Sequence, residues 1–295
     1  MGFISYQATR TCVNCGHEFI GDAWDRRCPN CRLAQAIVRD ALISPEHEAL
    51  RQTWLAEEAA SFQGWDFSYL DRRFIEEPLP WDYREVVWQY LQPEHRLLDM
   101  GTGGGEVLLS LEHPYDHISV TEAYAPNVAM CLEYLAPLGI TVRQIYADDV
   151  VPYDDAAFDI VINRHESFDI SEVKRVLKPG GVFITQQVGG DNGYELSKVL
   201  AANYDWPHAA FCLAGNIEIV QDAGFTVLQS EECHLESRFI DVGAVVYYAK
   251  VIPWQFPDFS AASHFSELMK LQHILEQQGY IPCHQSRFYL VARRQ

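Results

Sequence analysis

From residue 96 onward, hydrophobic residues come in short runs separated by turns rich in glycine, proline and acids. Five of these runs have the length and composition of buried strands: 96–100, 117–122, 141–147, 158–163 and 182–188. Helical patterns lie between them, at 106–111, 125–139 and 170–181, the last stopped by Pro179 and turned by Gly180 and Gly181. Strands that alternate with helices form a parallel sheet covered on both faces, so the pattern predicts an α/β domain over residues 96–295. Its ligands should bind at the carboxyl ends of the strands.

The segment before this domain has a different pattern and reads as mostly helical. Ser44 and Pro45 form a helix start, a cap followed by a first-turn proline. An aromatic-rich stretch at 64–83 and an amphipathic helix at 84–91 follow. We therefore predict a helical cap or lid over residues 36–95.

Residues 1–35 contain two CxxC pairs separated by twelve residues, Cys12 with Cys15 and Cys28 with Cys31. Two such turns direct four thiolates at one ion and close a tetrahedral zinc site with no open position. We predict a small zinc ribbon whose metal is structural. The alternative, a redox dithiol, would need only one of the pairs.

A glycine-rich turn joins the first predicted strand to its helix. Gly101, Gly103 and Gly105 allow positive φ and close approach of the backbone to a ligand, and Asp99 ends the strand. A dinucleotide-binding loop would have its third glycine at position 106, beside a diphosphate, but the chain has Glu106 there. The loop therefore suits a ligand that lacks phosphates and carries positive charge.

Acids follow the next two strands. Glu122 ends the second strand, where a carboxylate can accept both hydroxyls of a ribose. Asp148 and Asp149 follow the third strand and could meet an adenine amino group. Adenine, ribose and a cationic head without phosphate together describe S-adenosylmethionine.

Four segments in this order resemble the motifs of class I S-adenosylmethionine-dependent methyltransferases: LLDMGTGGGE, SVTEAY, DDVVPYDDAAFDIVINR and RVLKPGGVFIT. The stretches INRHESFD, TQQVGGDN and VVYYAKVIPWQFPDF are similar to a bacterial subgroup of such methyltransferases. The resemblance implies a Rossmann-like seven-stranded sheet whose last strand, 286–294, inserts antiparallel. A looser similarity to a zinc-bearing ribosomal-RNA guanine methyltransferase rests on a metal module that precedes such a domain.

The resemblance also implies cofactor contacts. Asp99, Gly101 and Gly103 would border the methionine part, Glu122 the ribose, and Asp148 or Asp149 the adenine. The chain departs from the family at Tyr146-Ala147, where Gly-Asp is common, so the two aspartates stay open. The full predicted cofactor set adds four neighbours: Thr102, Gly105, Ala123 and Asn163.

Methyl transfer from a sulfonium needs alignment of the acceptor and exclusion of water, and a base only if the acceptor must lose a proton. Arg164, His165 and Glu166 follow the fourth strand at its ligand-facing end. We predict that His165 is a general base or an acceptor-orienting group, with Glu166 as its partner. Alternatively, Arg164 and Glu166 form a structural ion pair and His165 faces solvent. Gln186 and Gln187 are further candidates for hydrogen bonds to the substrate.

Aromatic residues are concentrated in 64–83 and in two predicted lid insertions, near 189–212 and 241–279. Aromatic walls suit a small, flat or apolar acceptor.

A net charge of −19 disfavours a nucleic-acid substrate, although Arg26, Arg27 and Arg32 flank the second CxxC pair. An RNA-base methyltransferase guided by the ribbon, and a non-catalytic cofactor-binding protein, remain as alternatives. With no bilayer-length apolar run and no signal-peptide pattern, we expect a cytoplasmic protein without membrane contact.

Overall fold

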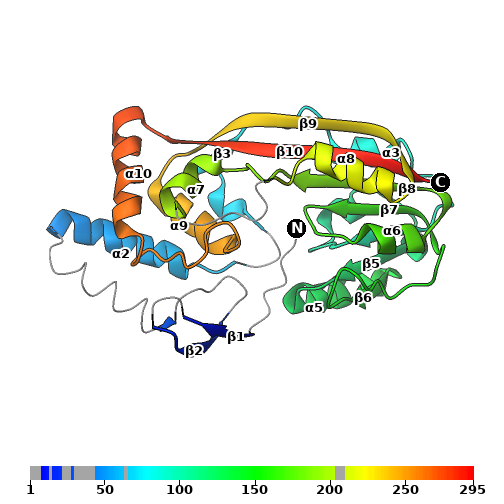
Figure 1. Cartoon of the computed structure of the whole chain (residues 1–295), viewed down its shortest axis with the longest axis horizontal. Helices are drawn as coiled ribbons and strands as arrows, with labels where there is room; N and C mark the ends of the chain where they lie inside the picture. Colours follow the sequence, from blue (N-terminus) through cyan, green and yellow to red (C-terminus); the bar gives the residue numbers. More distant parts are fainter. Residues whose placement is uncertain (1–7, 13–14, 22–27, 30–43, 63–65, 203–209) are drawn as a thin grey trace.

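The computed structural model describes residues 8–12, 15–21, 28–29, 44–62, 66–202 and 210–295 of the 295-residue chain. Its centre is an eight-stranded sheet in the order β3-β9-β10-β8-β7-β4-β5-β6 (Figure 1). Helices flank the sheet, and a separate two-stranded sheet lies near the N-terminus. The predicted α/β class is therefore confirmed.

Five strands are parallel: β4 (Leu97–Met100), β5 (Ile118–Glu122), β6 (Thr141–Gln144), β7 (Phe158–Arg164) and β8 (Leu177–Val188). Strand β4 is buried along its whole length between β5 and β7, which explains why all its residues except Asp99 are apolar. The helices between the strands are α4 (Glu106–Leu109), α5 (Ala125–Tyr134) and α6 (Ile170–Val176). Short 3-10 turns complete the connections at Tyr115–His117 and Ala136–Leu138.

Two long antiparallel strands extend the sheet, β9 (Phe225–Phe239) and β10 (Ile281–Arg294). Strand β10 lies between β8 and β9 and is antiparallel to both, as predicted for the last strand. It begins at Ile281, before the predicted start at 286. The sheet also has an eighth strand, β3 (Phe74–Glu76), which pairs with the end of β9. This short strand lies in the segment predicted as helical, because β9 offers it a free edge there.

The boundary between α6 and β8 differs from the predicted helix over 170–181. The helix ends at Val176, and Leu177 already has extended backbone angles. Pro179 accounts for this, because a proline disfavours helical geometry in the residue before it. The helix therefore has to end upstream of Lys178 rather than at the proline.

Helices from three parts of the chain form a cap at one end of the sheet (Figure 1). They are α2 (Pro45–Ala59), α7 (Tyr194–Leu200), α9 (Val242–Val251) and α10 (Phe265–Gln278). Helix α2 begins as predicted, with the Ser44 hydroxyl accepting a hydrogen bond from the His47 N–H. The cap has its own apolar core, which includes Trp54, Phe239 and Tyr247. The 3-10 helix η1 (Ser68–Leu70) also packs in the cap, because Leu70 belongs to its core. Helices α3 (Tyr83–Trp88) and α8 (Leu213–Asp222) lie elsewhere.

One arginine ties the cap together. Arg73 makes paired hydrogen bonds to Asp241, at 2.6 and 2.9 Å, and to Glu57, at 2.8 and 3.1 Å. Asp241 is also the N-cap of α9 and accepts from the Ala244 N–H. The Asp241 pKa is lowered by Arg73 and the backbone donors, although burial opposes this. The network fixes α9 against α2 through the residue that precedes β3.

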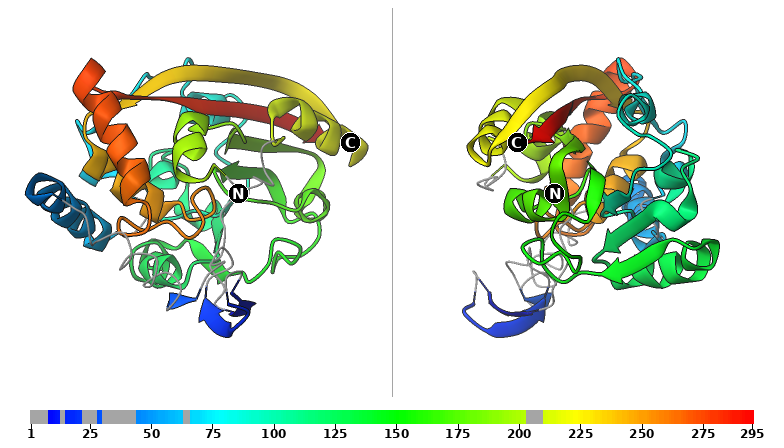
Figure 2. Two further views of the ribbon diagram at one scale, coloured as in Figure 1. Left: turned by 60° about the vertical axis from the view of Figure 1, so that its left-hand side comes forward. Right: turned by 90° about the vertical axis from the view of Figure 1, so that its right-hand side faces the viewer.

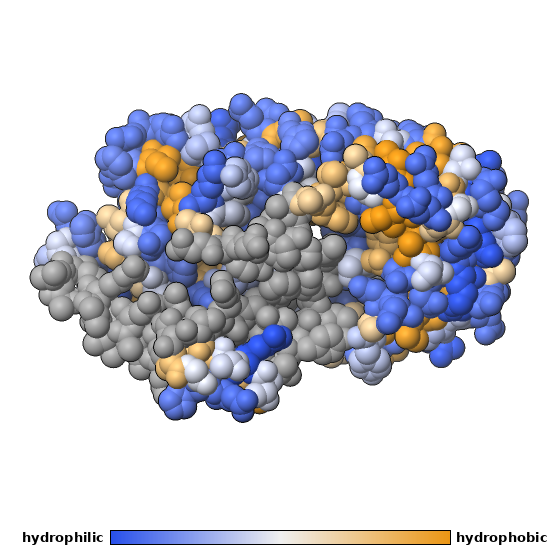
Figure 3. All heavy atoms as spheres, viewed as in Figure 1, coloured by the Kyte–Doolittle hydropathy of each residue, from blue (hydrophilic) through white to orange (hydrophobic). Residues whose placement is uncertain are grey.

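The N-terminal hairpin consists of β1 (Ala8–Thr11) and β2 (Glu18–Gly21), which pair antiparallel. It lies apart from the large sheet in every view (Figures 1 and 2). Hydrophilic residues dominate much of the face drawn in Figure 3. Among the described residues, no helix combines the length and the apolar character needed to cross a bilayer.

Candidate cofactor and acceptor site

The glycine-rich turn after β4 is anchored to the end of β5. The N–H groups of Gly101 and Thr102 donate to the Thr121 carbonyl, at 3.0 and 3.2 Å. The Gly103 N–H donates to the Glu122 carboxylate at 2.8 Å. That carboxylate also accepts from the N–H groups of Ala123 and Tyr124, both at 2.9 Å. Glu122 is therefore held in place beside the loop, as a ribose-binding acid must be.

Glycine is required at position 101 by both conformation and space. Gly101 has φ +72°, and a Cβ atom there would lie 2.3 Å from Cγ of Glu166. Gly105 also has positive φ, and a Cβ would meet the Leu135 side chain at 2.9 Å. The close approach of Gly101 and Glu166 brings the loop after β4 against the segment after β7. The predicted cofactor loop and the predicted catalytic segment are thus in direct contact.

A cavity of about 460 Å³ opens above this contact. Eight of the predicted site residues line it: Asp99, Gly101, Thr102, Gly103, Glu122, Arg164, His165 and Glu166. A neighbouring hollow of about 620 Å³ shares Phe67, Phe74, Glu76 and Glu106 with it. We centre the site on the smaller cavity because it contains the glycine loop.

Five predicted cofactor residues are not among the lining residues: Gly105, Ala123, Asp148, Asp149 and Asn163. Asn163 is fully buried, and its side chain bonds to the Met100 carbonyl, to Thr185 and to Gln187. Asp148 accepts a 2.5 Å hydrogen bond from Ser167, next to Glu166, whereas Asp149 is exposed. Their roles toward the cofactor stay predictions.

Several acids are concentrated at the loop end of the cavity. Burial raises the pKa of Asp99 to about 7, and the charge of Glu122 adds to this. Burial and the charges of Glu122 and Asp148 raise the pKa of Glu166 to about 7. The pKa of Glu122 is also raised by burial, despite its backbone donors. A positively charged ligand would stabilise the ionised form of these buried carboxyls. Glu106 adds an exposed carboxylate at the start of α4, where a bound diphosphate would be repelled.

His165 has an unusual backbone and a neutral ring. Its φ is +58°, in the sparsely populated left-handed region. Burial, together with the charges of Arg164 and Arg287, lowers its pKa well below the ordinary value. Its hydrogen-bonding partner is Gln186 rather than the predicted Glu166, with 3.0 Å between the Gln186 Nε2 and the His165 Nε2.

The tautomer of His165 follows from a chain of hydrogen bonds. Trp81 can only donate through its indole N–H, and it donates to Gln186 Oε1 at 2.8 Å. The amide nitrogen of Gln186 therefore faces His165 and donates to its Nε2. A neutral imidazole that accepts at Nε2 carries its proton on Nδ1. This arrangement agrees with an orienting donor, one of the two roles predicted for His165.

The two glutamines support the segment that follows β7. Gln186 and Gln187 are both buried in β8, and neither lines the cavity. The Gln187 amide donates to the Asn163 side chain at 2.6 Å and to the Glu166 carbonyl at 2.9 Å. They position His165 and Glu166, and this agrees better with a supporting role than with substrate contact.

Arg164 ends β7, is exposed and lines the cavity. Neither it nor Glu166 takes part in an ion pair among the described residues, so the alternative Arg164–Glu166 pair does not form there. Desolvation by the surrounding protein lowers the Arg164 pKa, and the nearby charge of Arg287 contributes.

The far end of the cavity is aromatic and comes from the cap and the neighbouring loops. Its rings are Phe67, Phe74, Phe211, Tyr248 and Trp254. Polar lining residues that were not predicted include Glu76, Asn192, Gln255 and Arg287. Arg287 lies within the predicted last strand, and only the register of that strand against β8 shows that it faces the cavity.

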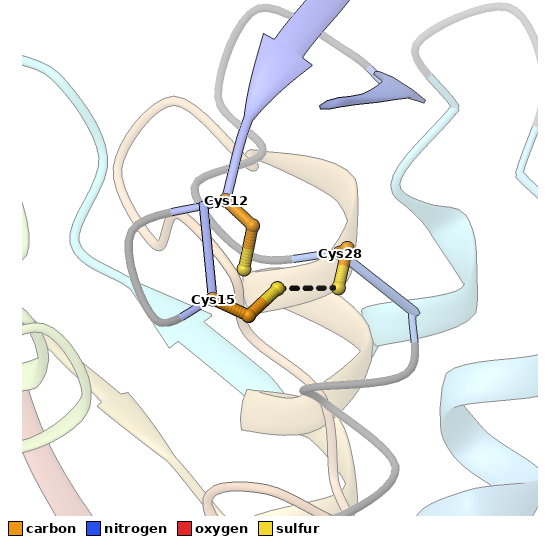
Figure 4. A group of neighbouring side chains, drawn as sticks. All are labelled: Cys12, Cys15 and Cys28. Atoms are coloured by element: carbon orange, nitrogen blue, oxygen red, sulfur yellow. Dashed lines mark hydrogen bonds between the residues drawn. The ribbon is translucent and has the colours of Figure 1, made fainter. Parts of the chain in front are cut away.

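Three of the four predicted zinc ligands converge. The Sγ atoms of Cys12, Cys15 and Cys28 lie within 4.8 Å of one another (Figure 4). Gly16, with φ +74°, turns the chain after the first pair, and its N–H donates to the Cys12 carbonyl at 2.9 Å. Cys31 lies outside the described residues. Three thiols in this arrangement fit a tetrahedral zinc site that a fourth sulfur would close.

Comparison with known proteins supports the fold and the loop. Residues 98–185 match the family model described as a methyltransferase domain. A 68-residue segment is 44% identical to the uncharacterized protein YafE of Escherichia coli K12, and covers 21% of this chain and 32% of that protein. The chain thus matches about a third of the length of this curated relative.

Solved structures are similar only at low identity. YcgJ of Bacillus subtilis has 16% identity and a TM-score of 0.48, over 72% of this chain and 98% of that one. A SAM-dependent methyltransferase of Aquifex aeolicus has 17% identity and a TM-score of 0.43, over 77% and 93%. Such scores are too low to establish function. The match of residues 98–185 to a methyltransferase domain, together with the glycine loop and the strand order, supports a class I S-adenosylmethionine-dependent methyltransferase.

Proposed function

We propose that the protein transfers a methyl group from S-adenosylmethionine to a small aromatic or heterocyclic acceptor. One observation carries this proposal: a single cavity joins an acidic, phosphate-repelling glycine loop to a wall of aromatic side chains. The first end suits a cationic nucleoside, and the second suits a flat acceptor. The net charge of −19 supports a small molecule over nucleic acid as the acceptor.

The residues of the chain would act by binding, orienting and excluding water. S-adenosylmethionine supplies the methyl group, on a positively charged sulfur. Asp99 and Glu166 would lose their protons as that charge arrives, because their pKa values of about 7 reflect burial without a cation. Glu122 would accept the ribose hydroxyls from its fixed position beside the loop. The cap would keep water away from the reacting atoms.

His165 would orient the acceptor by donating from Nδ1. The Trp81–Gln186–His165 chain supports this, since it occupies Nε2 and leaves the ring proton on Nδ1. A lowered pKa also makes the ring a poor base. The acceptor would then be one that reacts through a lone pair and loses its proton afterwards to water.

We further propose that Cys12, Cys15, Cys28 and Cys31 hold one structural zinc ion, in a chain that works in the reducing cytoplasm. The convergence of three thiols at the end of the hairpin supports the site. A four-sulfur site has no position for substrate, so the metal would stabilise the module and take no part in methyl transfer.

The acceptor class can be tested with labelled cofactor. Cell extract is incubated with protein and S-adenosylmethionine carrying a labelled methyl group, and then split into RNA, protein and small-molecule fractions. We expect label in the small-molecule fraction. Label in RNA would favour a nucleic-acid acceptor guided by the ribbon, and no label with tight cofactor binding would indicate a non-catalytic binding protein.

Two substitutions then test the role of His165. His165→Ala should leave cofactor affinity unchanged and lower the rate of labelling by about 10²-fold or more, because acceptor orientation is lost. His165→Asn places an amide N–H near the position of Nδ1 and should recover part of that rate. An Asn variant as slow as the Ala variant would instead favour a general base, and normal turnover of the Ala variant would exclude either role.

A further inference from the structure

Two arginines face the cavity on the acceptor side of the glycine loop. Arg164 ends β7 and pairs with Gln186 of β8, which pairs in turn with Tyr289 of β10. Arg287 lies two residues before Tyr289 and pairs with Val188. Side chains of paired residues, and of residues two apart on one strand, point to the same face of a sheet. Arg164 and Arg287 therefore share a face, and both line the cavity.

Arg287 is far from the position of the cofactor. From β4, which carries the glycine loop, the sheet order runs through β7 and β8 to β10. Three strand spacings of roughly 4.8 Å place the backbone of Arg287 about 14 Å from β4. Glu122 lies one strand further away, on β5. A nucleoside bound over β4 and β5 thus leaves Arg287 at the opposite end of the cavity, among Phe211, Tyr248 and Trp254.

The guanidinium of Arg287 is held in place by hydrogen bonds from Nη1. Its Nη1 donates to the Asn192 side chain and to the Ser286 carbonyl, at 2.5 and 2.9 Å. Its Nη2 makes a long ion pair with Glu76, at 3.8 Å. That separation is too long for a hydrogen bond. The group is thereby oriented by neutral partners, while its Nη2 side has no hydrogen-bonded carboxylate among the described residues.

Arg164 brings a second positive charge toward the same space. In the described part of the chain, no carboxylate lies within ion-pair distance of it. Desolvation and the charge of Arg287 lower its pKa, and the charges of Tyr83 and Asp99 oppose this only in part. Two neighbouring guanidinium groups in one cavity repel each other unless an anion lies between them.

We propose that the methyl acceptor carries a carboxylate, which Arg287 binds from the end of the cavity remote from the glycine loop and Arg164 binds from β7, one strand away from β4. The proposal rests on the function proposed above and specifies its substrate class: an aromatic or heterocyclic acid. Arginine is suited to such binding because its planar fork matches a carboxylate with two parallel hydrogen bonds. The acceptor ring would lie between the arginines and the aromatic wall, with its reacting atom toward the loop.

Calorimetry on the full-length protein saturated with S-adenosylhomocysteine tests the proposal. The probes are 4-hydroxybenzoate and indole-3-acetate, each compared with its own primary amide, which matches the acid in size but lacks charge. We expect the wild-type protein to bind at least one acid about tenfold or more tightly than its amide. Arg287→Gln and Arg164→Gln should each remove this preference. Arg293→Gln, an exposed position on the same strand, should retain it.

A second arm separates the two sources of a carboxylate, the acceptor and the amino-acid part of the cofactor. S-adenosylhomocysteine has that carboxylate, and 5′-methylthioadenosine does not. We expect Arg287→Gln to change the affinity for both by less than about twofold. If the substitution weakens only S-adenosylhomocysteine, the arginine serves the cofactor and the proposal is wrong.

The remaining outcomes are also decisive. Equal binding of acids and amides, or binding of neither to a protein that holds S-adenosylhomocysteine, overturns the anionic acceptor while leaving the methyltransferase function intact. Failure of the wild-type protein to bind S-adenosylhomocysteine at all would instead overturn the proposed function, and this inference with it.

Discussion

The cofactor end and the acceptor end of the cavity are built in opposite ways. The cofactor end comes from a continuous stretch, Asp99 to Glu166, in which each contributing residue follows a parallel strand. The acceptor end is assembled from separate segments, from Phe67 near the N-terminal side to Arg287 on the last strand. The first is acidic and contains glycine where the backbone must approach a ligand, and the second is aromatic and includes Arg287.

This contrast shows that the two ends of the cavity depend on different features of the fold. The cofactor end is determined by local chain geometry, because a strand, a tight turn and a helix place the loop and its acids together. The acceptor end depends on long-range packing of the cap, whose core is separate from the cores on the two faces of the sheet. A change at one end should therefore leave the other largely unaffected, and the predictions below test that independence.

The largest effect is expected from Gly101→Ala. The new Cβ would lie 2.3 Å from Glu166 Cγ, in a backbone conformation that alanine disfavours. We expect affinity for S-adenosylmethionine, measured by calorimetry, to fall by about 100-fold or more, while the cap stays folded. Gly180→Ala is the matched control, because its φ of +78° imposes the same strain with no neighbour within 4 Å. Equal losses in both variants would show that strain, and not contact with Glu166, controls the loop.

An intermediate effect is expected from Arg73→Ala, which acts on the acceptor end. The change leaves Glu57 and Asp241 facing each other without their shared cation. We expect the free energy of unfolding to fall by about 2 kcal/mol, since all three groups are only partly buried. Cofactor affinity should change little.

Arg72→Ala provides the control for this change, because Arg72 is the exposed neighbour and should cost less than about 0.5 kcal/mol. Denaturant unfolding measures both variants. Similar stability of the two would mean that the Arg73 network does not hold the cap.

The smallest effect is a pH dependence of the cofactor end. The pKa values of Asp99 and Glu166 rise from 3.8 and 4.5 to about 7, so the ligand-free folded protein retains protons that the unfolded chain releases. Stability of the ligand-free protein should therefore fall as pH rises from about 4 through about 7.

Cofactor binding should respond in the opposite direction. A sulfonium favours the charged carboxylates, so the affinity for S-adenosylmethionine relative to neutral-sulfur S-adenosylhomocysteine should rise with pH, by up to about tenfold between pH 6 and 8. Calorimetry in matched buffers measures this ratio, and Glu166→Gln should flatten its rise. A ratio independent of pH would mean that these acids do not face the sulfonium.

The same contrast explains what could be predicted from the sequence. The strands, the loop and the acids Asp99 and Glu122 could be placed because each depends on local patterns: apolar runs, glycines and residues at strand ends. Pro179 was predicted to stop the helix after β7, and only its last turn, after Val176, differs. The edge strand β3 could not be predicted, because it depends on a free strand edge.

Side-chain partners were harder to predict than positions. Gln186 holds the His165 ring only because Trp81, more than one hundred residues away in the chain, fixes the orientation of its amide. Arg287 faces the cavity through the register of β10 against β8, a pairing between distant segments. Neither contact leaves a signal in a single sequence.

The central claim is that the loop after β4 binds a positively charged nucleoside without phosphates. Calorimetric titration of the full-length protein with S-adenosylmethionine and with NAD, under identical conditions, tests it most directly. The structure predicts saturable binding of S-adenosylmethionine and no binding of NAD, because the Glu106 carboxylate at the start of α4 would repel a diphosphate there. Binding of NAD alone, or of neither compound, would contradict it.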